Sequence, residues 1–99
     1  METPEMTTEF KIVIHGLPDA QCKGCKFTKL RLDRAGVPYE FIDLSLDENE
    51  QTREAIRSLG HMQAPYVLLS DGTDWTGLDP DKIDDAVAKY NRSKLQAVA

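Results

Sequence analysis

The chain has 99 residues, of which 40% are hydrophobic and 29% are charged, and its formal net charge is −5. This length holds one hydrophobic core, and the composition is that of a globular domain rather than of a disordered or fibrous chain. The acidic balance excludes a general nucleic-acid-binding protein, which needs a basic surface, and no apolar run approaches the roughly 18 residues that a membrane span requires.

The N-terminal part predicts a tail, a strand and a helix. Residues 1–8 form a polar tail without the cationic segment and apolar stretch of a secretory signal, so we expect a cytoplasmic protein. Residues 10–14 are rich in β-branched side chains and predict a strand. A helix is expected over residues 22–35, because Gly36 is well placed just past its end.

The first helix is expected to turn three residues inward, namely Phe27, Leu30 and Ala35. Pro38 then prevents the helix from continuing. Residues 39–43 follow it and predict a second strand.

The second helix has two possible starts, because two stretches fit a capping box. These are Ser45-x-x-Glu48 and Asp47-x-x-Glu50. In either one, the side chain before the helix would accept a hydrogen bond from a backbone N–H of the first turn. Gly60 is expected to close this helix.

A β-hairpin is expected next. Residues 66–70 predict a strand, and Asp71-Gly72 is a turn signal. A short strand around Trp75 should therefore pair back on the strand before the turn.

The last helix has a clear start, since Asp79 is a favoured N-cap residue and Pro80 suits the first helical position. Apolar residues then recur at helical spacing, namely Ile83, Ala86, Val87 and Tyr90. Residues 92–99 are expected to form a polar tail, so that the domain spans residues 9–91.

The predicted order is β-α-β-α-β-β-α, an α/β fold with three helices and a four-stranded sheet. A strand–helix–strand opening gives two parallel strands. The closing hairpin adds two antiparallel strands, so the sheet is expected to be mixed and covered by helices on both faces.

Cys22 and Cys25 are the two cysteines of the chain, and they form a C-x-x-C motif at the expected start of the first helix. A disulfide across so short a loop stabilises a fold little. Unpaired N–H groups and the helix dipole at this end favour a thiolate over a thiol. Cys22 is therefore expected to attack a disulfide, and Cys25 to resolve the mixed disulfide that results.

The first helix is strongly basic. It holds five of the 12 Lys and Arg residues, namely Lys23, Lys26, Lys29, Arg31 and Arg34. We assign Lys23 a functional role, because its charge lies inside the motif and favours the thiolate. Arg31 and Arg34 are expected to form a solvated helix face.

Binding of zinc or an iron–sulfur cluster is the competing interpretation of the motif. Structural zinc takes four ligands, and the chain adds only His15 and His61 to the cysteines. His15 ends the first strand and could approach Cys22, but a lone histidine is more often a satisfied core or surface residue. We expect no bound metal or cofactor, with the cysteine pair itself as the redox-active group.

Pro65 directly precedes the third strand. In a C-x-x-C protein this position favours a cis bond between Ala64 and Pro65, which leaves the Ala64 backbone free to pair with an extended substrate beside Cys22. The alternative is a proline that simply begins a strand.

The segment from Trp75 to Pro80 is a further candidate. A single tryptophan near a turn is most often a packing residue. Gly77, however, suggests a close backbone approach at a substrate groove.

These residues resemble those of the NrdH-redoxins, which are glutaredoxin-like proteins of bacteria and their phages. The shared features are the strand ending at Gly16, Cys22-x-x-Cys25, Ala64-Pro65 and Trp75-Thr76-Gly77-x-x-Pro80-Asp81-x-Ile83. The similarity spans residues 10–87. The block that begins at Trp75 is its most specific part, since all glutaredoxins and thioredoxins share the other features.

The resemblance implies a thioredoxin fold and a monomeric electron carrier. NrdH-redoxins take electrons from NADPH through thioredoxin reductase and reduce the active-site disulfide of the large subunit of class Ib ribonucleotide reductase. The groove for these partners is expected to be lined by Lys23, Gly24, Gln63, Ala64, Pro65, Trp75, Thr76 and Gly77.

Two regions depart from the family pattern. Gly24 stands where glutamine is common, and Leu78-Asp79 stand where phenylalanine and a basic residue are usual. A glutathione-dependent glutaredoxin is therefore the alternative, but its tripeptide carboxylates would need a cationic pocket. The start of the last helix is instead acidic, with Asp79, Asp81, Asp84 and Asp85.

Overall fold

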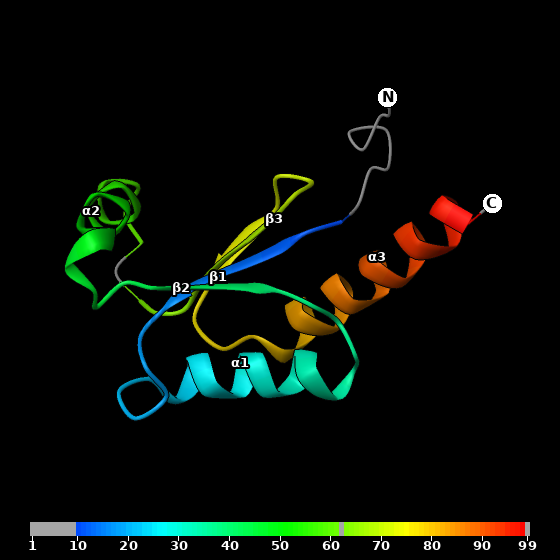
Figure 1. The fold of residues 1–99 in the computed structure, drawn as a ribbon, viewed down its shortest axis with the longest axis horizontal. Helices are drawn as coiled ribbons and strands as arrows, with labels where there is room; N and C mark the ends of the chain where they lie inside the picture. The colour runs from blue at the N-terminus through cyan, green and yellow to red at the C-terminus, as the bar shows by residue number, and fades with distance from the viewer. Residues whose placement is uncertain (1–9, 62, 99) are drawn as a thin grey trace.

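The computed structural model describes residues 10–61 and 63–98, so the expected tail of residues 1–8 lies outside the described part. The elements follow the predicted order (Figure 1). The strands are β1 (Ile12–Gly16), β2 (Glu40–Asp43), β3 (Tyr66–Leu69) and β4 (Asp74–Thr76). The helices are α1 (Lys23–Arg34), α2 (Glu50–Ser58), which the 3₁₀ turn η2 (Asp47–Asn49) precedes, and α3 (Pro80–Val98).

The four strands form one sheet in the order β2-β1-β3-β4. β1 runs parallel to β2 and antiparallel to β3, and β3 pairs antiparallel with β4. The mixed sheet of the predicted fold class is therefore confirmed. The hairpin turn is also where we expected it, with Gly72 at a φ of +94°, a conformation that glycine adopts without strain.

Helices cover both faces of the sheet. Figure 1 shows α1 and α3 together along one side and α2 apart from them. The larger core lies between the sheet and the α1/α3 pair, and consists of Ile12, Ile14, Leu32, Val37, Val67, Leu69, Trp75, Ile83 and Ala86. A smaller cluster on the α2 side consists of Leu44, Ile56 and Tyr66.

The inward face of α1 differs from the expected one. Phe27 is 49% exposed and Ala35 is also exposed. The buried residues of the helix are Cys25, Thr28 and Leu32. Cys25 decides which side of the helix faces the sheet, because its sulfur packs against the end of β1. Thr28 and Leu32 lie one and two turns further on, on the same side of the helix, and are therefore buried as well.

Neither capping box forms at α2. Ser45 instead donates from its backbone N–H and its hydroxyl to Asp43 Oδ1, at 2.9 and 2.6 Å. Asn49 precedes the helix and donates its side-chain amide to the Asp43 carbonyl at 2.7 Å. These polar groups therefore stabilise the turn after β2 rather than the first turn of the helix.

The start of α3 is confirmed and its end is not. Asp79 Oδ1 accepts a hydrogen bond from the Lys82 N–H at 3.2 Å, and Pro80 is the first helical residue. Residues 92–98, which we expected to be a tail, continue the helix. Within the described residues, no helix is both long and apolar enough to cross a membrane.

Candidate functional site

The two cysteines lie at the start of α1, as expected. Cys22 is the N-cap residue and forms a disulfide with Cys25, with the two Cα atoms 5.3 Å apart. The Cys25 backbone N–H donates to Cys22 Sγ at 3.1 Å. Because that donor points at Cys22 Sγ at the positive end of the helix dipole, negative charge is favoured on this sulfur once the disulfide is reduced.

The two sulfurs differ in access. Cys25 is 0% exposed, whereas Cys22 is half-buried. A partner can therefore reach Cys22 more readily than Cys25. This difference agrees with the expected roles of attacking and resolving thiol.

Gly16 allows the end of β1 to pack against Cys25. A Cβ atom at Gly16 would lie 2.6 Å from Cys25 Sγ, closer than any side chain could tolerate. The next residue, Leu17, donates its backbone N–H to the same sulfur at 3.4 Å. Sequence reasoning used Gly16 only as the end of a strand. The missed signal was a glycine that ends the strand before a C-x-x-C motif.

Pro65 packs directly against the motif. The Ala64–Pro65 bond is cis, as expected. A Cβ atom at Gly24 would lie 3.2 Å from Pro65 Cδ and 3.5 Å from Leu78 Cβ, so a residue without a side chain suits the contact. The Gly77 N–H donates to the Pro65 carbonyl at 2.8 Å and joins the two loops.

Other expected groove residues surround the same point. The Gln63 side chain covers Gly77, whose φ is +81° and whose added Cβ would meet Gln63 Oε1 at 3.2 Å. Ala64 is half-buried, and no backbone partner for its N–H or C=O occurs among the described residues. Lys23 is exposed, and Thr76 pairs with Tyr66 in the hairpin. That these residues bind a partner remains a prediction.

Trp75 does not line an open groove. It is 9% exposed and belongs to the larger core, which agrees with the packing interpretation of a tryptophan near a turn. Among the residues that the structure describes, its indole Nε1 has no hydrogen-bond partner. The residue is therefore part of the core packing rather than of an open surface.

His15 lies on the opposite face from Cys25. It is buried, its Nδ1 lies 3.1 Å from the Tyr66 carbonyl, and its ring is 5.4 Å from the Tyr66 ring. Among residues 10–61 and 63–95, no three His, Cys, Asp or Glu side chains gather as metal ligands.

Sequence comparisons identify relatives of this chain. The glutaredoxin family model matches residues 7–73. The glutaredoxin-like protein NrdH of Escherichia coli K12 is 33% identical over 63 residues, which are 64% of this chain and 74% of that protein. The NrdH protein of Shigella flexneri matches with the same values.

Solved structures of similar proteins also match this chain. The NrdH-redoxin of Escherichia coli superposes with a TM-score of 0.67 and 32% identity, over 76% of this chain and 92% of that one. A glutaredoxin of Archaeoglobus fulgidus gives a TM-score of 0.65 over 88% and 96% of the two chains. Its identity of 24% supports the shared fold alone.

Proposed function

This chain belongs to the glutaredoxin family, as a member of its NrdH-redoxin group, and we propose that it carries electrons from NADPH, through thioredoxin reductase, to the large subunit of a class Ib ribonucleotide reductase. Whatever its partners, it is a thiol–disulfide oxidoreductase. The observation that carries the proposal is the Cys22–Cys25 disulfide at the N-terminus of α1, in a chain so similar to NrdH.

The reaction follows from the access of the two sulfurs. The Cys22 thiolate attacks one sulfur of the client disulfide, and the other client sulfur leaves as a thiolate. Cys25 then loses its proton and attacks Cys22 Sγ, which releases the second client thiolate. Two electrons pass to the client, and the Cys22–Cys25 disulfide that forms is reduced again by thioredoxin reductase.

Thioredoxin reductase is preferred to glutathione as the electron source for two reasons. The related Escherichia coli NrdH-redoxin is described as having a thioredoxin-like activity profile. In addition, the start of α3 is acidic: Asp81 is exposed there, and Asp79 is held at the helix start by its capping bond, whereas Asp85 pairs with Lys89 at 3.4 Å. Negative charge at this point opposes an anionic tripeptide.

A small pocket favours the glutathione-dependent alternative. It has a volume of about 210 Å³ and is lined by Gln63 and Ala64 together with Arg53 and Arg57. Both arginines have partners, however. Arg53 Nη1 donates to the Leu44 carbonyl at 2.7 Å, and Arg57 pairs with Glu54 at 3.3 Å. Glu54 therefore offsets the charge of Arg57, whereas the neutral Leu44 carbonyl fixes the Arg53 side chain and leaves its charge in the pocket.

The test is a comparison of two electron sources in one assay. NADPH oxidation is measured with insulin as the disulfide substrate, first with thioredoxin reductase and then with glutathione plus glutathione reductase. A third assay replaces insulin with the oxidised large subunit of a class Ib ribonucleotide reductase. The Cys22→Ser variant provides the background rate in each.

Turnover with thioredoxin reductase and reduction of the ribonucleotide reductase disulfide are the expected results. Turnover with glutathione alone would assign the protein to the glutathione-dependent glutaredoxins. Turnover with thioredoxin reductase and insulin, without reduction of the large subunit, would reject ribonucleotide reductase as the client and retain thioredoxin reductase as the electron source. The proposed role also places the protein in the reducing cytoplasm and as a monomer, because a carrier must release both of its partners.

A further inference from the structure

The resolving step requires Cys25 as a thiolate, although its sulfur is buried. Cys25 is 0% exposed, and burial disfavours the charged form of a thiol. Within the described part of the chain, one N–H group donates to Cys25 Sγ, namely that of Leu17 at 3.4 Å. A donor in this position stabilises a thiolate. Whatever holds Leu17 in place therefore affects the resolving step.

Leu17 lies between the end of β1 and a turn that leads to the cysteine motif. The Gln21 N–H donates to the Pro18 carbonyl at 2.8 Å and closes this turn. Residues 19–21 are exposed, so no core packing fixes them. The turn keeps one position only if another element holds it from outside.

An ion pair ties this turn to α1. Lys29 Nζ lies 2.6 Å from Asp19 Oδ1, and the two side chains are 20% and 51% exposed. The same ammonium group lies 4.2 Å from the centroid of the Phe41 ring on β2, close enough for a cation–π contact. Lys29 therefore holds the turn from a position that β2 itself stabilises.

Phe41 also brings Lys29 to the other side of the buried sulfur. A Cβ atom at Gly16 would lie 3.3 Å from Phe41 Cε1 and 2.6 Å from Cys25 Sγ, so the ring and the sulfur both border on Gly16. Lys29 follows Cys25 by four residues and thus lies on the same side of α1. The contacts of Lys29 therefore bracket the Gly16-Leu17 segment that surrounds the sulfur.

The other charged groups of this region do not make such a link. Charged side chains approach it from α1, from the turn and from β2, namely Lys26, Lys29, Asp33, Asp19 and Asp43. Asp33 accepts from the Tyr39 hydroxyl at 3.4 Å, and Asp43 accepts from Ser45. Lys26 is exposed, and His15 lies on the opposite face of the sheet. In the described residues, Lys29–Asp19 is thus the only ion pair that joins the turn to α1.

We propose that Lys29 is a positioning residue for the resolving step: its ion pair with Asp19 holds the turn so that the Leu17 N–H stays directed at Cys25 Sγ and stabilises the Cys25 thiolate. This inference rests on the two-step exchange of the proposed function and adds a residue to it. The first attack should not depend on the pair, because Cys22 Sγ has its own N–H donor within α1, that of Cys25 at 3.1 Å.

The two steps can be followed separately with dithiobis(nitrobenzoate), an aromatic disulfide whose thiolate product is coloured. The Cys22 thiolate attacks one sulfur of the reagent, forms a mixed disulfide and releases the first aromatic thiolate. Cys25 then loses its proton to solvent and attacks Cys22 Sγ, which closes the disulfide and releases the second aromatic thiolate. Two electrons in all pass from the protein to the reagent. With pre-reduced protein and excess reagent, stopped-flow absorbance measures one phase for each step.

Lys29→Met removes the charge and keeps an aliphatic contact with Phe41. The second phase is expected to be about fivefold slower at neutral pH, and its dependence on pH should move up by about 0.7 pH units, so that the rates converge at alkaline pH. Asp19→Asn should have the same effect, and the double variant should have no larger one. Lys29→Arg should restore most of the rate, because a guanidinium can pair with Asp19 and stack on Phe41.

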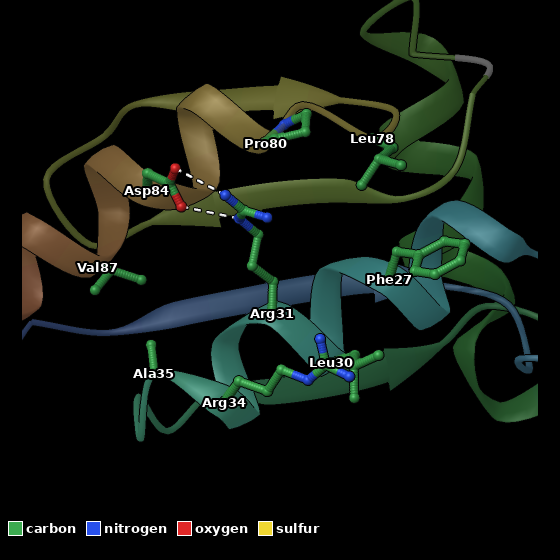
Figure 2. Close-up of a pocket in the computed structure, with 9 residues that line it drawn as sticks. All are labelled: Phe27, Leu30, Arg31, Arg34, Ala35, Leu78, Pro80, Asp84 and Val87. Atoms are coloured by element: carbon green, nitrogen blue, oxygen red, sulfur yellow. Dashed lines mark hydrogen bonds and ion pairs between the residues drawn. The ribbon is translucent and has the colours of Figure 1, made fainter.

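Arg31→Met is the matched control. Arg31 also lies on α1, but it pairs with Asp84 of α3 through two hydrogen bonds of 2.9 Å, drawn in Figure 2, and so does not hold the turn. Both phases of this variant should keep their parent rates. The first phase should keep its parent rate in every variant, which also shows that each of them is folded around the cysteine motif.

An unchanged second phase in both Lys29→Met and Asp19→Asn would overturn the inference and leave the two-step exchange standing. A faster second phase in Asp19→Asn would also overturn it, since the charge of Lys29 alone would then act on Cys25. A second phase slowed by the same factor at every pH would indicate a displaced sulfur rather than a less stable thiolate, with the same consequence. Release of only one aromatic thiolate by the parent protein would reject the resolving role of Cys25, and with it both proposals.

Discussion

The two faces of the sheet differ in how much they bury and in what they hold. Under α1 and α3, nine hydrophobic residues of the described chain form one cluster, and Ile14, Val67 and Ile83 within it are 0% exposed. Under α2 there are three, and Leu44 and Ile56 are each still 8% exposed. The α2 side also carries polar contacts, since Tyr66 donates to Asp74 at 2.8 Å and stacks on His61 at 4.6 Å.

This difference shows why the redox pair belongs to the α1 face. Cys25 must keep its sulfur against Gly16, and a closely packed core holds such a contact in place. The α2 face closes the second side of the sheet with less apolar contact. We therefore expect changes on the α1 face to affect both stability and chemistry, and changes on the α2 face to affect stability alone.

The largest expected effect is on disulfide reduction, and it distinguishes the roles of the two cysteines. Cys22→Ser should lower disulfide reduction to background, because no exposed sulfur remains at the start of α1. Cys25→Ser should retain the first attack and accumulate a mixed disulfide with the client, which mass spectrometry detects. Full activity of the Cys22→Ser variant would reject the assignment of the attacking thiol.

A pair of isoleucines compares the two cores directly. Ile83→Ala should lower the free energy of unfolding by about 4 kcal/mol, and Ile56→Ala by about 2 kcal/mol, because the second site is partly exposed and can relax. Urea denaturation of both variants measures the difference. Equal losses would show that the α2 cluster contributes as much per residue as the larger core.

Gly16 tests whether the α1 face is coupled to the chemistry. Gly16→Ala places a methyl group against Cys25 Sγ, so we expect a loss of about 1–3 kcal/mol in stability together with a changed dithiol–disulfide equilibrium against dithiothreitol. Gly36→Ala is the matched control, since Gly36 has a φ of +72° and no atom near its Cβ position. The control should lose about 1 kcal/mol through backbone strain and keep the parent redox equilibrium.

Replacing Tyr66, on the α2 face, is expected to give the smallest change in the free energy of unfolding, and this change should depend on pH. Two causes raise the pKa of Tyr66 from 10.0 to about 12: burial is the larger, and the hydrogen bond to Asp74 is the second. The folded state thus holds this proton more tightly than the unfolded state does. The resulting stability is complete below about pH 10 and is lost as the pH rises towards about 12.

Tyr66→Phe should therefore be less stable than the parent protein by about 1 kcal/mol at neutral pH, and the gap should close as the pH approaches 12. Urea denaturation at several pH values measures it. Because the change lies on the α2 face, disulfide reduction should keep its parent rate. A gap that stays constant across this range would contradict the hydrogen bond to Asp74 as its source.

Much of the fold could be predicted from short stretches of the sequence. The order of the elements follows from turn residues and from short β-branched runs, and the start of α3 follows from Asp79 and Pro80. The placement of Cys22 at a helix N-terminus was equally local. These features depend on residues close in sequence, so the chain determines them before any long-range contact forms.

Other features depended on contacts between distant residues. The periodicity of α1 allows two inward stripes, one through Phe27 and Leu30 and one through Thr28 and Leu32. The second is buried because Cys25 must meet Gly16, a contact that the helix sequence does not contain.

The sequence by itself thus determined the element order, the cysteine pair and the positions of the turns. Only the tertiary structure decided that Trp75 is buried, that the polar residues before α2 bond to Asp43, and that residues 92–98 are helical. The physical reason is that a side chain's burial and its hydrogen-bond partner depend on which elements pack against it. Sequence spacing limits those choices, and long-range packing selects among them.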